Sequence, residues 1–411
     1  MSRFIYRTFD RAVEVLRSNT VEKGLRASSA YYNQVWARDS FISFLGANML
    51  GDEHLLSCAK ANLMTFAETA SPLGQIANFY DLANGTPEFG FSGSTDSSCW
   101  YIIGLASLLE ATDDRNLLRE PLKAAIAAYR WLRYQDANNT WLIDSPQGAD
   151  WMDAAIQRAG KTLYNNTLFL IATKCIESLL SSTGASLERV YRLDYPALLQ
   201  RFMDVFLPDS GSPARLASSW PRLSLAYGEG RPLGFARKYF LHYVSFSRID
   251  TRFDTLSNVL CLLSGLADTR TSLSVLTTIK SKGLSKPFPT RVLDPPHRAE
   301  GAGFDRAFNS SLPVQHQSGP FAYHNGGVWP FVGGLHVAAL FKMQVEDAKS
   351  ELESLARGDS VLRSGESVGF NEWIHSKTGE ALGQYGQSWS AGMFVAAVLA
   401  SKGRQLFGFL D

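Results

Sequence analysis

The feature that most constrains the fold is a helical spacing of apolar residues along almost the whole chain. Apolar side chains recur every three or four residues, the repeat of one face of an α-helix. The alternation typical of half-buried strands is nearly absent. About twelve predicted helices cover residues 11–17, 41–50, 55–69, 98–110, 118–133, 168–180, 195–206, 256–266, 272–279, 328–341, 345–356 and 390–399. The sequence therefore predicts an all-α fold.

The connections between these helices are of two kinds. Some are short, such as Gly51-Asp52 between two helical segments. Others are rich in Gly, Pro, Ser and aromatic residues and cover 71–95, 137–164, 207–250, 282–327 and 358–387. Long loops in a compact domain are usually functional. Short turns at one end and long loops at the other describe a toroid of helical hairpins. Because no change of composition marks a boundary, we expect one domain over residues 1–411.

The pattern also separates two kinds of helix. Segments 41–50 and 98–110 are apolar nearly all round, so we expect alternate helices to form a buried inner ring.

The composition excludes several classes of protein. With 45% hydrophobic and 19% charged residues, the chain can bury a large core. The 40 basic and 39 acidic residues leave a formal charge of +1 without a basic run, which argues against binding to nucleic acid. The longest apolar stretches, such as 393–400, are too short to span a bilayer.

The N-terminal residues and the cysteines point to the cytoplasm. The N-terminus shows no apolar signal region. Cys58, Cys99, Cys175 and Cys261 are scattered in apolar helical segments. We interpret them as buried free thiols in a reducing compartment, with disulfides as the alternative.

Two segments place carboxylates beside tryptophan: Asp150-Trp151 with Asp153, and Glu372-Trp373. An indole offers a flat apolar surface on which the C–H face of a sugar ring packs. An apolar neighbour also disfavours the charged form of an acid, so the acid can remain protonated near neutral pH. Two such acids, far apart in sequence, suggest the carboxyl pair of a glycosidase.

Each of these acids has a simpler interpretation. Asp150 and Asp153 are three residues apart and would share one face of a helix, where they could form a solvated acidic turn. The apolar residues around them favour a catalytic role for Asp153, with Asp150 as a neighbour in the site. Glu372 could lie in an ordinary surface loop. If Glu372 is not the base, Glu380 is the first alternative.

A second group of candidates precedes helices. Trp36, Arg38 and Asp39 crowd the start of one predicted helix, and Asp96 opens another. Helix capping is the simplest explanation for Asp39, and for Asp96 or Thr95. Capping does not explain why an indole and a guanidinium lie in the same turn as Asp39. We therefore predict that these side chains bind the hydroxyls of a substrate.

The last group of candidates lies around residues 323–330 and 384–390. His324, Asn325 and Trp329 surround two glycines, which allow the backbone to approach a ligand. A single histidine is usually structural, but these neighbours favour contact with a sugar. Gln387 and Trp389 begin the last helix and are predicted to bind substrate too. The seven histidines and the cysteines lack the spacing of metal ligands, so we expect no metal or cofactor.

Together, these motifs resemble two groups of enzymes. Segments 35–42, 151–154 and 384–390 resemble the C-terminal amylo-1,6-glucosidase domain of glycogen debranching enzymes. Segments 323–330 and 248–253 more closely resemble the alkaline/neutral invertases, which segment 33–39 fits as well. Around Asp153 the invertase pattern is Met-Ile-Asp followed by basic residues, and this chain departs from it.

The resemblance implies an (α/α)6 barrel, with six inner and six outer helices and the active site at the loop-rich end. It also implies an inverting glycoside hydrolase with Asp153 as general acid and Glu372 as general base. By the same resemblance, the site would be lined by Arg38, Asp39, Asp96, His324 and Trp329.

The expected substrate is small. Debranching enzymes hold a polysaccharide with additional N-terminal domains, whereas this chain begins almost at the barrel. We expect exo action on a small soluble sugar, with sucrose as the first choice. An α-glucoside, such as a short 1,6-branched oligosaccharide or a glucosyl compatible solute, is the alternative, and a non-catalytic sugar-binding protein is another. The sequence leaves the oligomeric state open.

Overall fold

The helices follow the predicted pattern closely. The computed structural model describes residues 1–29, 32–90, 94–228, 238–246, 248–301, 303–363, 365–366 and 368–410. Parts of four predicted loops (71–95, 207–250, 282–327 and 358–387) lie outside these ranges. The principal helices are α1 (Arg3–Ser18), α2 (Ala37–Leu50), α3 (Glu53–Glu68), α4 (Asp96–Thr112), α5 (Glu120–Arg133), α6 (Leu163–Ser181), α7 (Tyr195–Phe206), α11 (Thr255–Leu263), α12 (Thr269–Ser281), α14 (Pro330–Lys342), α15 (Ala348–Asp359) and α16 (Ser388–Ala400). Each predicted helix is confirmed.

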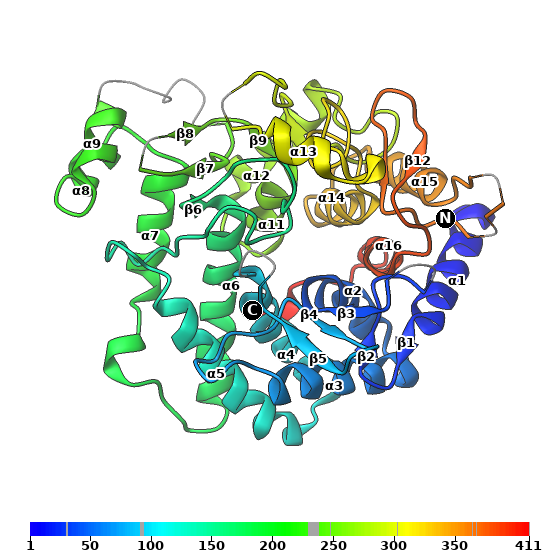
Figure 1. Cartoon of the computed structure of the whole chain (residues 1–411), viewed down its shortest axis with the longest axis horizontal. Helices are drawn as coiled ribbons and strands as arrows, with labels where there is room; N and C mark the ends of the chain where they lie inside the picture. Colours follow the sequence, from blue (N-terminus) through cyan, green and yellow to red (C-terminus); the bar gives the residue numbers. More distant parts are fainter. Residues whose placement is uncertain are drawn as a thin grey trace.

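These helices alternate between an outer and an inner position. The inner helices are α2, α4, α6, α11, α14 and α16. Each contacts the next, and α16 contacts α2, so the ring is closed (Figure 1). All nine residues of α11 are buried, and α16 is buried from Ser388 to Leu399. The outer helices α1, α3, α5, α7, α12 and α15 bury one side only. This arrangement is an (α/α)6 barrel, and the predicted inner positions of 41–50 and 98–110 are confirmed.

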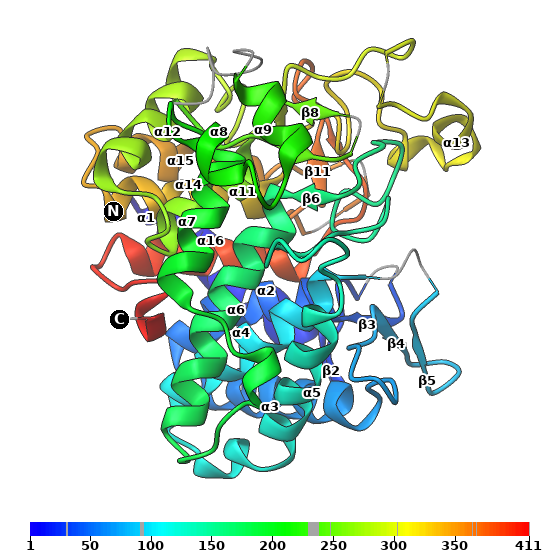
Figure 2. The same cartoon turned by 90° about the vertical axis from the view of Figure 1, so that its left-hand side faces the viewer.

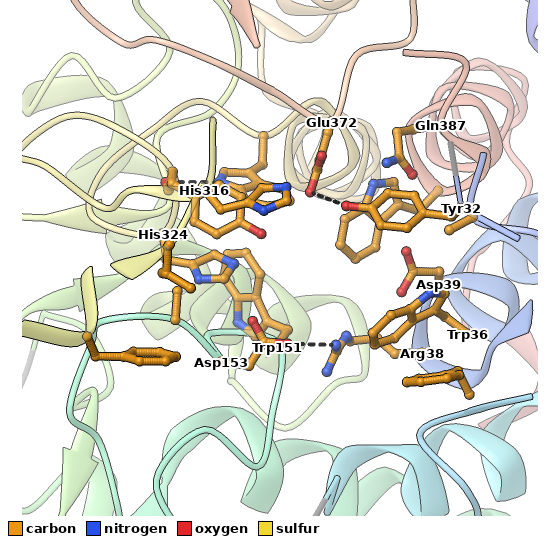
Figure 3. Close-up of a pocket in the computed structure, with 18 residues that line it drawn as sticks. Tyr32, Trp36, Arg38, Asp39, Trp151, Asp153, His316, His324, Glu372 and Gln387 are labelled. Carbon is orange, nitrogen blue, oxygen red and sulfur yellow. Dashed lines mark hydrogen bonds and ion pairs between the residues drawn. The ribbon is translucent and has the colours of Figure 1, made fainter. Parts of the chain in front are cut away.

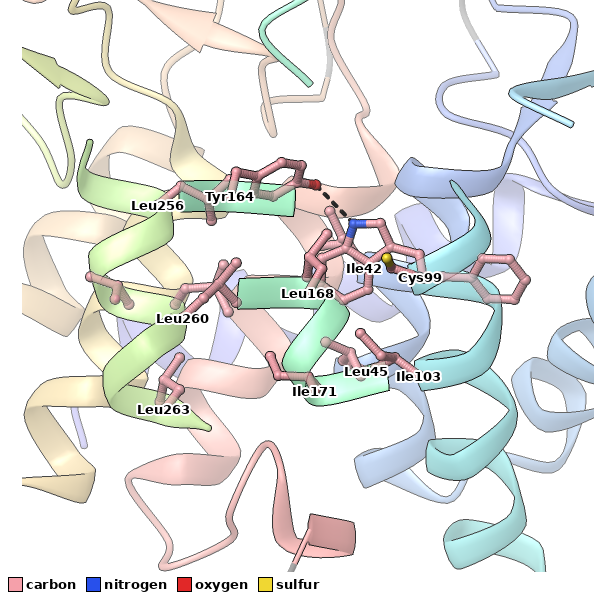
Figure 4. Packing of buried hydrophobic residues seen from close by; sticks show 14 of the residues in the cluster. Ile42, Leu45, Cys99, Ile103, Tyr164, Leu168, Ile171, Leu256, Leu260 and Leu263 are labelled. Carbon is pink, nitrogen blue, oxygen red and sulfur yellow. Dashed lines mark hydrogen bonds between the residues drawn. The ribbon is translucent and has the colours of Figure 1, made fainter. Parts of the chain in front are cut away.

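The inside of the ring is filled by aliphatic side chains from neighbouring inner helices. Figure 4 shows side chains of four neighbouring inner helices in this core, among them Ile42 of α2, Ile103 of α4, Leu168 of α6 and Leu260 of α11. In this region the indole N–H of Trp100 donates to the Tyr164 hydroxyl at 2.8 Å. The four cysteines are buried and free. Among the described residues, no helix is both long and apolar enough to cross a lipid bilayer.

The two ends of the barrel differ. The turn between α2 and α3 is short, as predicted: Gly51 ends α2 with φ 73°, and Asp52 caps α3. At the other end lie long connections that carry small antiparallel sheets and the short helix α13 (Arg306–Ser311) (Figure 2). Two further short helices, α8 (Ser212–Leu216) and α9 (Pro221–Gly228), follow α7.

The sheets order loops that sequence analysis left without structure. Their strands contain only two or three residues, too few to show an alternating pattern. The pairings are β1 (Thr20–Val21) with β2 (Gly24–Leu25); β3 (Gln34–Trp36), β4 (Phe79–Asp81) and β5 (Thr86–Glu88); β6 (Lys161–Thr162), β7 (Tyr243–Val244) and β8 (Ile249–Asp250); β9 (Phe253–Asp254) with β10 (Leu293–Asp294); and β11 (Trp373–Ile374) with β12 (Ala381–Leu382). Register matters most in β3–β4, where Trp36 pairs with Phe79.

Glycines allow α2 and α16 to touch backbone to backbone. A Cβ atom added to Gly46 would lie 1.9 Å from the carbonyl oxygen of Gly392, and one added to Gly392 would lie 2.6 Å from the carbonyl oxygen of Ser43. The two helices could accept larger residues only by moving apart, which would open the ring.

Gly46→Ala should therefore lower the free energy of unfolding by about 1–3 kcal/mol, the usual cost of overpacking. The clash outweighs the better helix propensity of alanine, worth up to about 1 kcal/mol. Urea denaturation measures the change. Gly319→Ala is the control, because a Cβ atom there meets nothing within 4 Å. Equal stability of the two variants would contradict backbone contact at Gly46.

Candidate active site

A pocket of about 300 Å³ opens at the loop-rich end of the barrel. This volume is near the lower limit of small-molecule sites, about 300–1,000 Å³. The pocket is lined by side chains from the first turn of α2, from the first turn of α16 and from Trp329, the residue before α14. The N-termini of these three helices therefore converge there. The described lining residues are Ala27, Tyr32, Trp36, Arg38, Asp39, Phe79, Trp151, Asp153, Ala154, Phe308, Leu312, His316, Tyr323, His324, Trp329, Glu372, Gln387 and Trp389.

Arg38 supplies a fixed positive charge. Its guanidinium lies 2.9 Å from the Asp96 carboxylate and 3.5 Å from that of Asp153, and its side chain is only 6% exposed. Burial alone would lower the pKa of Arg38, but the carboxylates of Asp96 and Asp153 raise it above its ordinary value. The guanidinium therefore remains charged at every relevant pH.

Asp153 lies in an irregular segment, and not in the helical turn that sequence analysis considered for Asp150 and Asp153. The two acids point to different environments. Asp150 turns away from the pocket and accepts from the Met152 backbone N–H at 2.9 Å. Asp153 faces the pocket beside Arg38 (Figure 3). Burial raises the pKa of Asp153 to about 6, with Arg38 opposing the shift and the charge of Asp150 adding to it.

Glu372 enters the pocket from the residue before β11. One carboxylate oxygen accepts from the Gln384 backbone N–H at 2.9 Å, and the other lies 3.5 Å from the Tyr32 hydroxyl (Figure 3). Burial raises the pKa of Glu372 to about 8; the Gln384 N–H opposes the shift, and the charges of Asp39 and Asp153 add to it. The β11–β12 pairing holds this carboxylate in place. Glu380, the alternative base, lies exposed on the same hairpin.

Asp39 is a third carboxyl group in the pocket. It lies in the first turn of α2, but Trp36 occupies the N-cap position and makes no side-chain capping bond. Capping is therefore not the role of Asp39. Burial raises its pKa to about 7, and Arg38 opposes the shift.

Aromatic rings form the wall beside Asp153. His324 stacks on Trp329 with ring centroids 5.1 Å apart, and Trp151 meets both rings edge to face. Burial holds the pKa of His324 well below its usual value, so this ring is neutral. The indole N–H groups of Trp151 and Trp389 and the side-chain oxygen of Gln387 have no protein partner among the described residues.

Four predicted binding residues lie behind the pocket wall. Asp96 pairs with Arg38, and Asp150 pairs with Arg158. Asn325 bonds the backbone of residues 297 and 318 through its amide group. The Trp373 indole donates to the carbonyl of Gln315 at 2.9 Å. The structure thus assigns these side chains contacts that support the wall, while the other predicted residues reach the pocket itself.

Several lining residues were missed by sequence analysis. Tyr323 belongs to the 323–330 motif and Tyr32 directly precedes the 33–39 motif, so both could have been included on that ground. Phe79 is brought to Trp36 by the register of β3 and β4, with ring centroids 4.6 Å apart. Phe308 and Leu312 lie in a long connection with no local signal, because their position depends on how that connection folds.

A buried ionic network lies behind Asp150. Arg158 donates to Asp150 at 2.7 Å and to Asp254, the N-cap of α11, at 3.2 Å. Its Nη1 also lies 2.8 Å from Nε2 of His242. Since a guanidinium can only donate, Nε2 must accept, which places the histidine proton on Nδ1 facing Asp250 at 3.6 Å. The network ties the segment that carries Asp153 to the inner ring.

The chemistry of this pocket is that of acids and aromatic rings. Among the described residues, no group of three or more His, Cys, Asp or Glu side chains is arranged to hold a metal ion. The sequence matches the amylo-alpha-1,6-glucosidase family over residues 9–396.

The chain belongs to the amylo-alpha-1,6-glucosidase family. It is thereby a glycoside hydrolase. A curated relative, the mitochondrial alkaline/neutral invertase C of Arabidopsis thaliana, is 28% identical over 165 residues. That match spans 39% of this chain and 23% of the invertase, so the chain covers less than a quarter of this relative.

Solved structures of other glycosidases share the fold. A family 63 mannosylglycerate hydrolase from Thermus thermophilus, in complex with Tris, has a TM-score of 0.64 at 14% identity and covers 95% of this chain and 99% of its own. A bacterial glucoamylase complexed with acarbose has a TM-score of 0.61 at 13% identity and covers 98% of this chain and 57% of its own. At such low identity these likenesses concern the barrel and not the substrate.

Arg158→Met should lower the free energy of unfolding by about 3–5 kcal/mol, because it leaves two buried carboxylates without their cation. Chemical denaturation measures the loss. Lys123→Met is the matched control. The side chains of Lys123 and of its ion-pair partner Glu120 are 73% and 65% exposed. This pair should contribute only about 0–1 kcal/mol to the free energy of unfolding. Similar effects of the two substitutions would mean that the Arg158 network does not support the barrel.

Proposed function

We propose that this protein hydrolyses the terminal glycosidic bond of a small neutral sugar with inversion of configuration, using Asp153 as general acid and Glu372 as general base. The observation that carries the proposal is that these two carboxyl groups, from distant loops, line one small pocket with aromatic walls. The closed ring of inner helices supports a single catalytic domain over residues 1–411.

In this mechanism the acid protonates the leaving oxygen and the base activates a water molecule on the opposite face of the sugar. The aromatic wall of Trp151 and Trp329 packs against the ring of the cleaved sugar. Asp39 and Gln387 offer hydrogen-bond partners for its hydroxyls. Arg38 stabilises negative charge on Asp153 after its proton has left.

The protonation of the pair is an unusual feature of the pocket without sugar. With pKa values of about 6 for Asp153 and about 8 for Glu372, a single shared proton resides mainly on Glu372. The productive form has this proton on Asp153. Substrate binding must therefore favour transfer of the proton from Glu372 to Asp153, for example through the hydrogen bond that the leaving oxygen accepts from Asp153.

Two substrate classes are supported by different observations. The family match over residues 9–396 favours an α-1,6-linked glucoside. The invertase match and the motif around His324 favour sucrose. Incubation with sucrose, isomaltose, panose, trehalose and glucosylglycerate, followed by measurement of released monosaccharide, tests both. Release from none of them would oppose the proposal.

Substitution of the two acids tests their roles. Asp153→Asn and Glu372→Gln should each lower turnover of the best natural substrate by at least about 10²-fold. Fluoride leaves with little need of a proton, so Asp153→Asn should still hydrolyse an α-glucosyl fluoride while Glu372→Gln should not. NMR should show the product with inverted anomeric configuration.

The control is Glu380→Gln, which changes an exposed acid on the same hairpin and should leave turnover unchanged. Loss of activity in this variant would transfer the role of base to Glu380. The opposite fluoride result would exchange the roles of Asp153 and Glu372. A retained anomer would rule out inversion.

The pH dependence of kcat/KM should be bell-shaped, with limbs near the pKa values of about 6 and about 8. Below the lower value both carboxyl groups are protonated, so water has no base. Above the higher value both are ionised, so the leaving group receives no proton. The limbs belong to the coupled carboxyl groups of the pocket, Asp39 included, and not to one residue. A profile that stays flat from pH 5 to 9 would contradict these protonation states of the two acids.

A further inference from the structure

The segment from residue 303 to residue 318 contributes side chains to the lining of the pocket, and we call it the arch. It contains α13 and a 3-10 turn, Val314–His316. Figure 2 shows α13 at the loop-rich end of the barrel, on the same side as the β3–β4–β5 sheet. Three side chains of the arch, Phe308, Leu312 and His316, line the pocket.

The arch is bonded to both catalytic loops. At its start, the Asp305 backbone N–H donates to the Ala155 carbonyl at 2.8 Å, two residues after Asp153. Near its end, the carbonyl of Gln315 accepts from the indole of Trp373, the residue after Glu372. The arch therefore occupies a fixed place relative to the two acids.

The pocket has two chemically different parts. Gln387, Trp329 and Trp389 are at most 5% exposed, and they offer polar atoms and aromatic faces. Phe308, in contrast, is 41% exposed although it lines the pocket. It lies four residues before Leu312 at the end of α13, so the two side chains share one side of the arch.

We propose that Phe308 and Leu312 form the wall of the leaving-group subsite and select a neutral leaving group with an apolar face, such as a second sugar ring. This inference rests on the proposed function. The general acid must reach the glycosidic oxygen, so the leaving group lies on the Asp153 side, where Ala155 bonds the start of the arch. The buried part of the pocket then holds the sugar that is cleaved off.

The chemistry of the wall decides the class of leaving group. The C–H face of a pyranose ring covers Phe308 and Leu312 and removes their apolar surface from water. A charged leaving group on the same wall would lose hydration without gaining a partner from these two side chains.

The test compares an α-glucosyl fluoride, whose leaving group is a bare halide, with the disaccharide that the wild type hydrolyses best. Phe308→Ala and Leu312→Ala should each lower kcat/KM for the disaccharide about tenfold. Both should leave kcat/KM for the fluoride unchanged, because no ring contacts the wall. Phe308→Tyr keeps the aromatic face and should retain activity on the disaccharide. Val314→Ala is the control, because Val314 lies on the same arch but is 81% exposed.

Each other outcome overturns a specific statement. Unchanged disaccharide hydrolysis in both alanine variants would mean that the arch does not contact the leaving group. An equal loss on the fluoride would make the two residues structural. Preference of the wild type for an α-glucoside of glycerate over one of glycerol would contradict the selection of a neutral leaving group. Failure of the wild type on every glycoside and on the fluoride would remove the proposed function, and this inference with it.

Discussion

The ion pair between Arg38 and Asp96 is the interaction on which both the barrel and the pocket depend. Its partners lie in the first turns of α2 and α4, with a nitrogen–oxygen distance of 2.9 Å and almost no exposure to solvent. The Tyr164 hydroxyl of α6 donates to the same Asp96 carboxylate at 3.3 Å. Three consecutive inner helices thus meet at one buried carboxylate. Because an unpaired buried charge is costly, this arrangement fixes their relative positions.

The same guanidinium governs the electrostatics of the pocket. The Arg38 guanidinium compensates the buried negative charge of Asp96, and it also lies 3.5 Å from the Asp153 carboxylate. Glu372 has a backbone N–H and a tyrosine hydroxyl as its nearest hydrogen-bond partners, and no cation bonds it among the described residues. Burial consequently raises the pKa of Glu372 further than that of Asp153. A pocket with more acids than cations retains a proton near neutral pH, which acid–base chemistry requires.

A site built from loops must still hold its groups in place. Here the loops are bonded to one another and to the ring: Arg158 joins the Asp153 segment to the start of α11, and the β11–β12 pairing fixes Glu372. The arch connects the Asp153 segment to the strand after Glu372. These bonds hold the loop residues in fixed positions, as helix α2 does for Arg38 and Asp39.

The sequence by itself determined the helices and pointed to two of the acids that line the pocket. Three- and four-residue apolar spacing is a local property, so the twelve principal helices and the buried nature of the inner ones could be predicted, whereas the short helices α8, α9 and α13 were not. Asp153, Glu372 and their neighbouring tryptophans were recognisable because acid and indole adjoin in sequence. Only the tertiary structure decided which side of the wall each residue occupies. Asp150 and Asp153 are three residues apart, yet one binds Arg158 and the other faces the pocket, because the segment is irregular and not helical. Phe308 and Leu312 reach the pocket through hydrogen bonds between segments more than a hundred residues apart. No local pattern encodes such contacts, since they depend on how the closed ring brings the loops together.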